Sequence, residues 1–202
     1  MRKANADPLR KMTVPTKAIL SQTPSQTIGP FFAQGLTAAQ SDYPFDSIIH
    51  NTITGPGQAV HIQGRVFDGE DKAVDDALIE IWQADCNGQY DQKNFCGYAR
   101  CGTDYRDDLH FSFRTIKPGS CGVNQAPYIT VIVFMRGLMT HAFTRLYFDD
   151  EAAANEQDFV LRQLPEDRKA SLMAKRIEGE EGLTYVFDIH MQGADETLFF
   201  DI

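Results

Sequence analysis

The stretch "YITVIVFMRG", residues 128–137, decides the fold of this chain. Its β-branched and aromatic residues favour a strand. Because the apolar run is nearly continuous, we expect a central strand that is covered on both faces. Arg136 ends this run, so we expect its guanidinium in or beside a dry environment, where an unpaired charge is costly. Two kinds of anion could meet it: an acidic residue of the same chain, or a carboxylate or phenolate of a bound small molecule.

Further strands are expected on both sides of this stretch, because apolar and polar residues alternate there with the two-residue period of a half-buried strand. In the last of the long ones, Leu183, Tyr185, Phe187 and Ile189 are expected to face inward. The predicted strands cover residues 59–67, 77–84, 110–116, 142–148, 183–191 and 196–202.

Residues 149–177 interrupt this pattern. An alanine-rich start and Pro165, which is suited to the first turn of a second helix, predict a short helical excursion near residues 150–177. The fold class is therefore all-β, a β-sandwich of two sheets with that excursion. We expect residues 23–202 to form a single domain with an irregular N-terminal arm over residues 23–57, and residues 1–22 to be a flexible tail.

Composition excludes several classes of function. The formal net charge is -9, and a nucleic-acid surface needs clustered Lys and Arg, so nucleic acid is not an expected partner. No stretch has the length and hydropathy of a signal peptide or a membrane span. The four cysteines, none in a C-x-x-C pair, are expected to be reduced thiols in a cytoplasmic protein: Cys86, Cys96, Cys101 and Cys121.

Motifs for catalysis are scarce. The chain has no G-x-S-x-G elbow, phosphate-binding loop or dinucleotide-binding glycine motif. Its histidines are scattered and lack metal-ligand spacing, so a metal site within this chain is not predicted. Arg145, in "FTRLYFDD", is expected to form a surface ion pair. The histidines are His50, His61, His110, His141 and His190.

Longer motifs resemble those of the intradiol ring-cleavage dioxygenases, in the same order and at similar spacing over residues 23–202. The resemblance implies a β-sandwich alpha chain paired with a beta chain of shared ancestry, assembled into a higher hetero-oligomer of alpha-beta pairs. It implies a small aromatic substrate opened with O2, with no membrane partner and no organic cofactor. The motifs are "TPSQTIGPFF" (23–32), "RVFDG" (65–69), "IEIWQADCNGQY" (79–90), "RTIKPG" (114–119), "RLYFDDEAAAN" (145–155), "AKR" (174–176) and "ETLFFDI" (196–202).

The metal of this family is a non-haem ferric ion held by two tyrosines and two histidines. At the matching positions this chain has Tyr90, then Cys121 in place of the second tyrosine, and Tyr128 and Thr130 in place of the histidines. One ligand of four cannot hold a ferric ion. The resemblance thus implies that Fe(III) is bound by the partner beta subunit and not by this chain, which has no catalytic residue of its own.

The N-terminal segment of alpha chains in this family lies over the iron pocket of the beta chain. The resemblance implies that Thr27, Gly29, Pro30 and Phe31 wall that pocket, with Phe31 where relatives usually have tyrosine, and that Arg136 lies near the substrate at the subunit boundary. Two alternatives remain open: a non-catalytic β-sandwich scaffold or binding module derived from such a subunit, and, least supported, a one-chain enzyme for another catechol.

Overall fold

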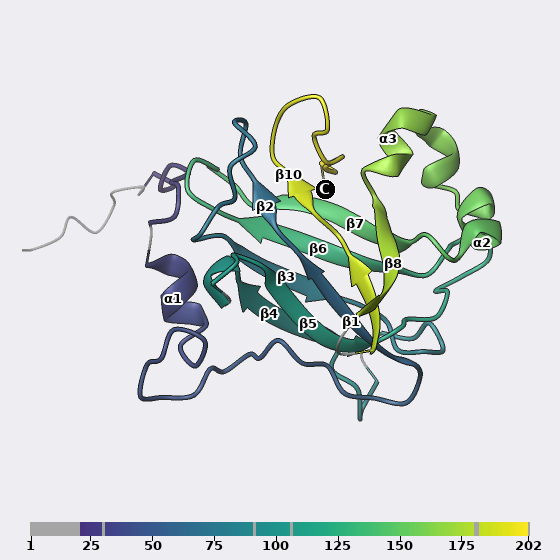
Figure 1. The fold of residues 1–202 in the computed structure, drawn as a ribbon, viewed down its shortest axis with the longest axis horizontal. Helices are drawn as coiled ribbons and strands as arrows, with labels where there is room; N and C mark the ends of the chain where they lie inside the picture. The colour runs from purple at the N-terminus through teal and green to yellow at the C-terminus, as the bar shows by residue number, and fades with distance from the viewer. Residues whose placement is uncertain (1–20, 30, 91, 106, 180–181, 202) are drawn as a thin grey trace, which may run out of the picture.

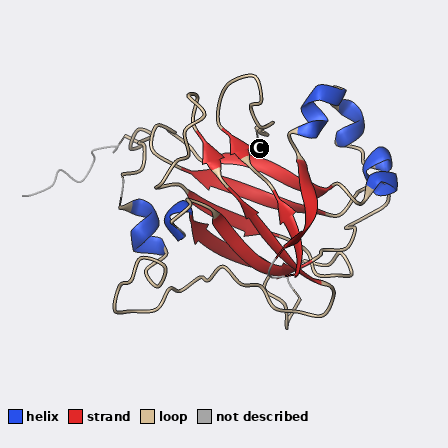
Figure 2. Cartoon of the chain, viewed as in Figure 1, coloured by secondary structure: helices blue, strands red, loops and turns tan. Residues whose placement is uncertain are grey.

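A computed structural model describes residues 21–29, 31–90, 92–105, 107–179 and 182–201. Most of its regular structure is β-strand (Figures 1 and 2), which confirms the all-β prediction. α1 lies at one end of the sheet, and α2 and α3 lie together at the other end (Figure 1). The helices are α1 (Phe32–Leu36), α2 (Ala152–Gln157) and α3 (Glu166–Ala170), with 3-10 turns at Thr103–Tyr105 and Leu161–Gln163. The strands are β1 (Ala59–Gly64), β2 (Val66–Phe67), β3 (Leu78–Trp82), β4 (Tyr98–Gly102), β5 (Phe111–Ile116), β6 (Tyr128–Phe134), β7 (Ala142–Phe148), β8 (Met173–Gly179), β9 (Gly182–Val186) and β10 (Ile189–His190).

The strands do not form two separate packed sheets, so that part of the expectation is wrong. Eight of them form one sheet in the order β4-β3-β6-β7-β8-β9-β1-β5, and β10 pairs with β2 beside it. A short parallel pairing of β7 with β8, through Tyr147–Met173 and Phe148–Ala174, joins the two halves. The sheet curls until its ends meet, since the N–H of Ser112 on β5 donates to Sγ of Cys101 on β4 at 3.3 Å. The result is a nearly closed sheet around one core.

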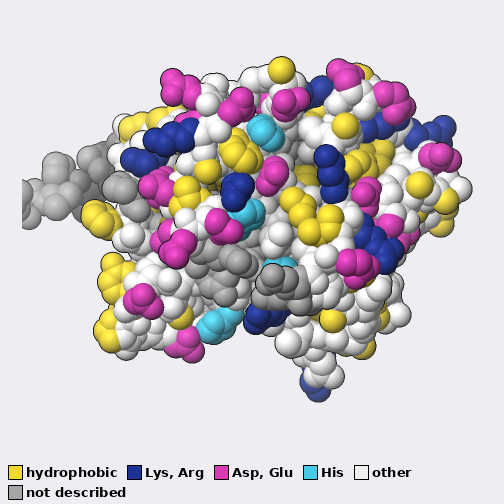
Figure 3. Space-filling model, viewed as in Figure 1, with side chains coloured by type: hydrophobic (Ala, Val, Ile, Leu, Met, Phe, Trp, Pro, Cys, Tyr) yellow, Lys and Arg dark blue, Asp and Glu magenta, His cyan; other side chains and the backbone are white. Residues whose placement is uncertain are grey.

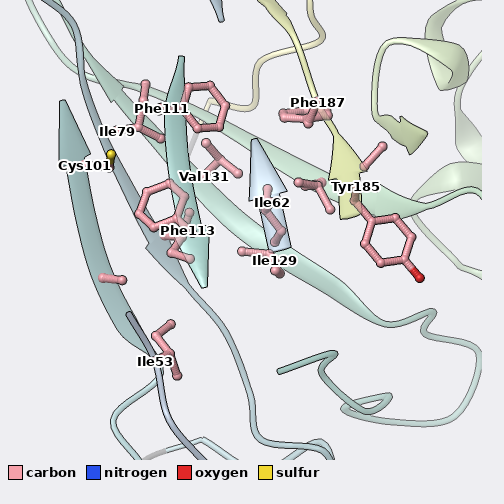
Figure 4. Packing of buried hydrophobic residues seen from close by; sticks show 14 of the residues in the cluster. Ile53, Ile62, Ile79, Cys101, Phe111, Phe113, Ile129, Val131, Tyr185 and Phe187 are labelled. Atoms are coloured by element: carbon pink, nitrogen blue, oxygen red, sulfur yellow. The ribbon is translucent and has the colours of Figure 1, made fainter. Parts of the chain in front are cut away.

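The core fills the space between the two halves of the curled sheet, and Figure 4 shows its side chains pointing toward one another from both halves. Tyr185, Phe187 and Ile189 are buried and Leu183 is partly buried, so the inward face predicted for this segment is confirmed. The large buried side chains include Ile62, Ile79, Ile81, Phe111, Phe113, Ile129, Val131 and Tyr185.

Strand β6 is fully buried on one face only. Its burial alternates strictly: Ile129, Val131 and Val133 are buried, whereas Ile132 and Phe134 on the other face are only partly buried. The expectation of a strand covered on both faces is therefore met only in part by this chain by itself. The outer face of β3, β6 and β7 keeps apolar side chains that the chain does not bury.

Tertiary pairing overrides the sequence pattern in several segments. The predicted strands 59–67 and 183–191 both break, and the carboxylate of Asp188 accepts the backbone N–H of Arg65 at 2.9 Å where they do. Residues 173–177 are strand rather than helix, because β8 pairs with β7 and β9. The segment 196–202 contributes one isolated bridge, Phe200 to Phe143, and no named strand among its described residues.

The surface carries both signs of charge. Figure 3 shows acidic and basic side chains interspersed over the face in view. Among the described residues, no helix is long and apolar enough to cross a lipid bilayer.

Candidate functional site

The N-terminal arm is fastened to the turn between β6 and β7. The backbone N–H of Gly137 donates to the hydroxyl of Thr27 at 2.9 Å. Gly137 has φ +92, a left-handed conformation that glycine adopts without strain. Further along the arm, the ring of Phe32 packs against Phe134 of β6, with 5.8 Å between centroids. The structure thus brings the predicted arm residues and the Arg136 turn into one neighbourhood.

The arm presents its side chains outward. Thr27 and Gly29 are exposed, and Phe31 is 75% exposed although it is a large aromatic residue. Pro30 lies outside the described residues. The ring of Phe31 is therefore accessible to another molecule.

Arg136 is not in a dry environment, which corrects the expectation drawn from its apolar neighbours. Its side chain is 56% exposed, because the strand ends at Phe134 and the chain turns outward. Its Nε contacts Oδ2 of Asp76, and Nη2 lies 3.6 Å from Oδ1 of Asp75. In the isolated chain, the anion that meets Arg136 is therefore acidic residues of the same chain.

Aromatic side chains continue from the arm across the outer face of the sheet. Phe134 lies 5.4 Å from the ring of His141, and His141 packs edge-on against Phe143 at 4.6 Å. Ile132, between Phe134 and Thr130 on β6, is also only partly buried. We call Ile132, Phe134 and Phe143 the outer apolar face.

The four positions that the resemblance matches to the family's iron ligands lie in one neighbourhood but carry other groups. The ring of Tyr90 packs at a tilt against Trp82, with 4.9 Å between centroids, and Tyr128 and Cys121 lie close enough to change its pKa. Burial, and next the contact with Tyr128, raise the pKa of Tyr90 far above its ordinary value. Burial also raises the pKa of Cys121, although Tyr90 and Arg145 oppose this. Both groups are therefore protonated at neutral pH.

Arg145 occupies this neighbourhood and forms no surface ion pair with any described residue, so that prediction is wrong. Its guanidinium lies 4.2 Å from the ring centroid of Tyr128, and Nη1 donates to the hydroxyl of Tyr147 at 3.2 Å. Burial by itself would lower the pKa of Arg145, but the Tyr147 contact and the charges around it outweigh burial and raise it. A permanent cation thus lies against one of the four positions.

These residues do not fit a ferric ion. The Tyr90 phenol and the Cys121 thiol stay protonated, neither Tyr128 nor Thr130 supplies an imidazole, and Arg145 would repel a metal cation. Within the part of the chain that the structure describes, no three His, Cys, Asp or Glu side chains gather as a metal site.

A family profile described as Dioxygenase matches residues 28–193. The chain belongs to the dioxygenase family. It is 46% identical over 195 residues to the protocatechuate 3,4-dioxygenase alpha chain of Burkholderia cepacia, covering 91% of this chain and 98% of that one. It is also 29% identical over 161 residues to the protocatechuate 3,4-dioxygenase beta chain of Burkholderia cepacia, covering 70% of this chain and 67% of that one.

The fold has a solved counterpart in the same family. The dioxygenase domain of a dioxygenase carbohydrate-binding protein fusion from Streptomyces sp. SirexAA-E has a TM-score of 0.59 at 28% identity, covering 86% of this chain and 100% of that one. These comparisons confirm the resemblance to ring-cleavage dioxygenases that the motifs indicated.

Sequence reasoning missed the position of Arg145. Its strand alternation placed it on a polar face, and nothing in the chain near it indicates that Tyr128 and Tyr147 lie beneath it. A signal was present in Tyr128 and Thr130, because they take positions that the resemblance matches to metal ligands, where a positive charge is expected.

Proposed function

We propose that this chain is the alpha subunit of a heteromeric protocatechuate 3,4-dioxygenase, active only with a beta chain that binds Fe(III). The reaction opens the ring of protocatechuate between its two hydroxyl-bearing carbons and inserts both atoms of O2, which gives 3-carboxy-cis,cis-muconate. The observation that carries the proposal is the set of ligand positions. Cys121, Tyr128 and Thr130 stand where the family's metal ligands stand, so this chain needs a partner that supplies the metal.

The role proposed for this chain is to wall the partner's substrate pocket. Thr27, Gly29, Pro30 and Phe31 form the arm side of the wall, and Arg136 forms the turn side. The hydrogen bond from Gly137 to Thr27 supports this, because it holds the arm beside the turn. The 75% exposure of Phe31 supports it too, since that ring is free to contact a flat ligand.

Arg136 can serve a substrate anion without giving up its own support. Asp76, whose side chain is only 13% exposed, engages Nε and fixes the orientation of the guanidinium. Asp75 is 68% exposed and lies at the looser distance of 3.6 Å. The terminal nitrogens therefore remain available for a carboxylate or for the negative charge that develops on the ring as it is oxidised.

The outer apolar face is the proposed docking surface for the beta subunit. Ile132 and Phe134 alternate with buried residues on a strand whose inner face is already packed, and this chain buries them only in part, so a second chain can cover the rest. Burying them at an interface would favour association by about 25 cal/mol of free energy for each Å² of apolar surface removed from water. Such pairs would assemble into a higher hetero-oligomer.

Co-expression with a beta chain tests the proposal. We expect the two chains to copurify, the complex to contain iron, and oxygen uptake to follow addition of protocatechuate. This chain purified by itself should bind no stoichiometric iron and lack a phenolate-to-iron charge-transfer band. A complex that contains iron but consumes no oxygen with protocatechuate would favour a scaffold role, and iron in the lone chain would contradict the subunit assignment.

A further inference from the structure

A cavity of about 330 Å³ opens beside Arg145, away from the arm and from Arg136. Its floor is the outer face of β6 and β7, its second wall is the C-terminal segment, and its third is the 3-10 turn that follows α2. The volume lies at the lower end of the range for small-molecule pockets, about 300–1,000 Å³. The lining residues used below are Thr130, Arg145, Val160, Leu164 and Phe200.

The C-terminal wall is firmly attached. The N–H of Phe200 donates to the carbonyl of Phe143 at 2.8 Å, and the hydroxyl of Thr144 donates to the carbonyl of Leu198 at 2.8 Å. The 3-10 turn is held by the buried carboxylate of Asp158, which accepts the N–H groups of Val160 and Leu161. The cavity is therefore formed by fixed elements.

Arg145 is the cation of this cavity, and it has no direct counter-ion among the described residues. In that part of the chain its guanidinium contacts Tyr147, Tyr128 and, at 5.6 Å, the ring of Phe200. A guanidinium has five N–H donors, and the described hydrogen bonds use one of them. Four of its donors therefore have no hydrogen-bond partner among the described residues.

The nearest compensating charge is already engaged. Asp158 attracts Arg145 through space, but its oxygens accept backbone N–H groups and the hydroxyl of Tyr147. It cannot also provide the two coplanar acceptors that a guanidinium prefers. Thr130, paired with Arg145 across β6 and β7, adds a hydroxyl at the same place.

We propose that this cavity binds a small aromatic carboxylate, with the carboxylate on Arg145 and Thr130 and the ring between Val160, Leu164 and Phe200. Planar anion and planar guanidinium match in geometry, and the apolar walls match a ring. This site is separate from the pocket wall proposed above and does not depend on a metal, although Phe143 lines the cavity and also belongs to the proposed docking surface. Titration of this chain without a partner therefore tests the inference independently of the proposed subunit role.

The test is calorimetric titration of the full chain with benzoate. We expect one saturable site per chain, with a Kd on the order of 1 mM for so small a ligand. Benzamide, which has the same shape but no charge, should bind at least about tenfold more weakly, because it loses the charge-assisted hydrogen bonds. This comparison uses the unmodified chain and does not depend on the folding of any variant.

Variants locate the site. Arg145→Gln should weaken benzoate binding at least about tenfold, whereas Arg176→Gln, at an exposed arginine outside the cavity, should leave it unchanged. If the chain is obtained only with its partner, Arg145→Gln should remove one benzoate per copy of this chain. Equal affinity for benzamide, an unchanged Kd in Arg145→Gln, or no saturable binding by the unmodified chain would each overturn the proposal.

Discussion

The hydroxyl of Thr27 accepts a hydrogen bond of 2.9 Å from the backbone N–H of Gly137, although the two residues are 110 positions apart. This one contact sets the arm against the turn that carries Arg136. An exposed segment without secondary structure of its own depends on few such contacts. Together with the packing of Phe32 on Phe134, the contact therefore helps the arm to present a fixed surface to a partner.

Thr27→Ala should loosen the arm without unfolding the chain. One hydrogen bond is worth about 1 kcal/mol, so we expect kcat/KM of the assembled enzyme to fall about fivefold and arm proteolysis to speed up. The melting temperature should stay within about 2 °C, because Thr27 is exposed. Thr27→Ser keeps the hydroxyl and is the matched control. Equal losses in both variants would mean that the methyl group, not the hydrogen bond, matters.

Arg136→Ala should reduce kcat/KM for protocatechuate by about 10- to 150-fold, the equivalent of about 1.5–3 kcal/mol for a hydrogen bond to a charged group. A higher KM with unchanged kcat would assign Arg136 to substrate anchoring, and equal losses in kcat and kcat/KM would assign it to the transition state. Arg176→Ala is the matched control, because Arg176 is another half-exposed arginine that pairs with carboxylates. It should leave kcat/KM unchanged. Activity of Arg136→Ala within twofold of the parent would remove it from the pocket wall.

Ile132→Lys should weaken association with the beta subunit by about 100-fold or more, because an unpaired charge would be buried at the interface. The chain should still fold, since Ile132 is only partly buried in the chain by itself. Ile177→Lys is the matched control: Ile177 is 41% exposed and lies on β8, in the other half of the sheet. Copurification and analytical ultracentrifugation measure the difference. Equal effects of the two variants would show that β6 is not the docking face.

The sequence predicted most strands and the family, but not which face of β6 would stay open. Alternation shows which positions are apolar, not what covers them, and in the proposed assembly Ile132 is covered by the partner subunit and not by this chain. The environment of Arg136 was mispredicted for a related reason: its apolar neighbours end at Phe134, and Asp75 and Asp76 reach it from a distant part of the chain. Long-range pairing also made residues 173–177 a strand despite their helical pattern.

Lys117 should stabilise the fold in a pH-dependent way. Its Nζ lies 3.0 Å from Oδ1 of Asp150 and 2.7 Å from Oε1 of Glu151, and its side chain is only 12% exposed. Burial opposes its charge, but these contacts outweigh burial and raise the pKa of Lys117 above its ordinary 10.5. Burial likewise opposes the charge of Asp150, but Lys117 and Tyr185 outweigh it and lower the pKa of Asp150 below 3.8.

Together, these two pKa shifts define a pH range in which the ion pair stabilises the fold fully. A raised lysine pKa stabilises the fold below about pH 10.5 and the gain is lost at higher pH, whereas a lowered aspartate pKa stabilises it above about pH 4 and the gain is lost in acid. Lys117→Met should therefore cost about 3 kcal/mol in the free energy of unfolding between those limits, and less below pH 4. Urea unfolding at pH 3, 5, 7 and 9 measures this. A cost that does not shrink at pH 3 would assign the effect of Lys117 to packing.

Restoring the family's ligands should not by itself restore a metal site. Cys121→Tyr, Tyr128→His and Thr130→His together supply the missing phenolate and imidazoles beside Tyr90, but Arg145 still places a cation against the position of the first imidazole. Like charges at that range are strongly repelled where water is scarce. We expect the triple variant to bind Fe(III) weakly, and the addition of Arg145→Gln to tighten binding by at least about 100-fold, as for about 3 kcal/mol of removed repulsion. The growth of the phenolate-to-iron absorption band during titration with ferric ion measures both affinities. If the triple variant already binds iron as tightly as the quadruple variant, Arg145 does not oppose the metal and its place beside Tyr128 has another cause.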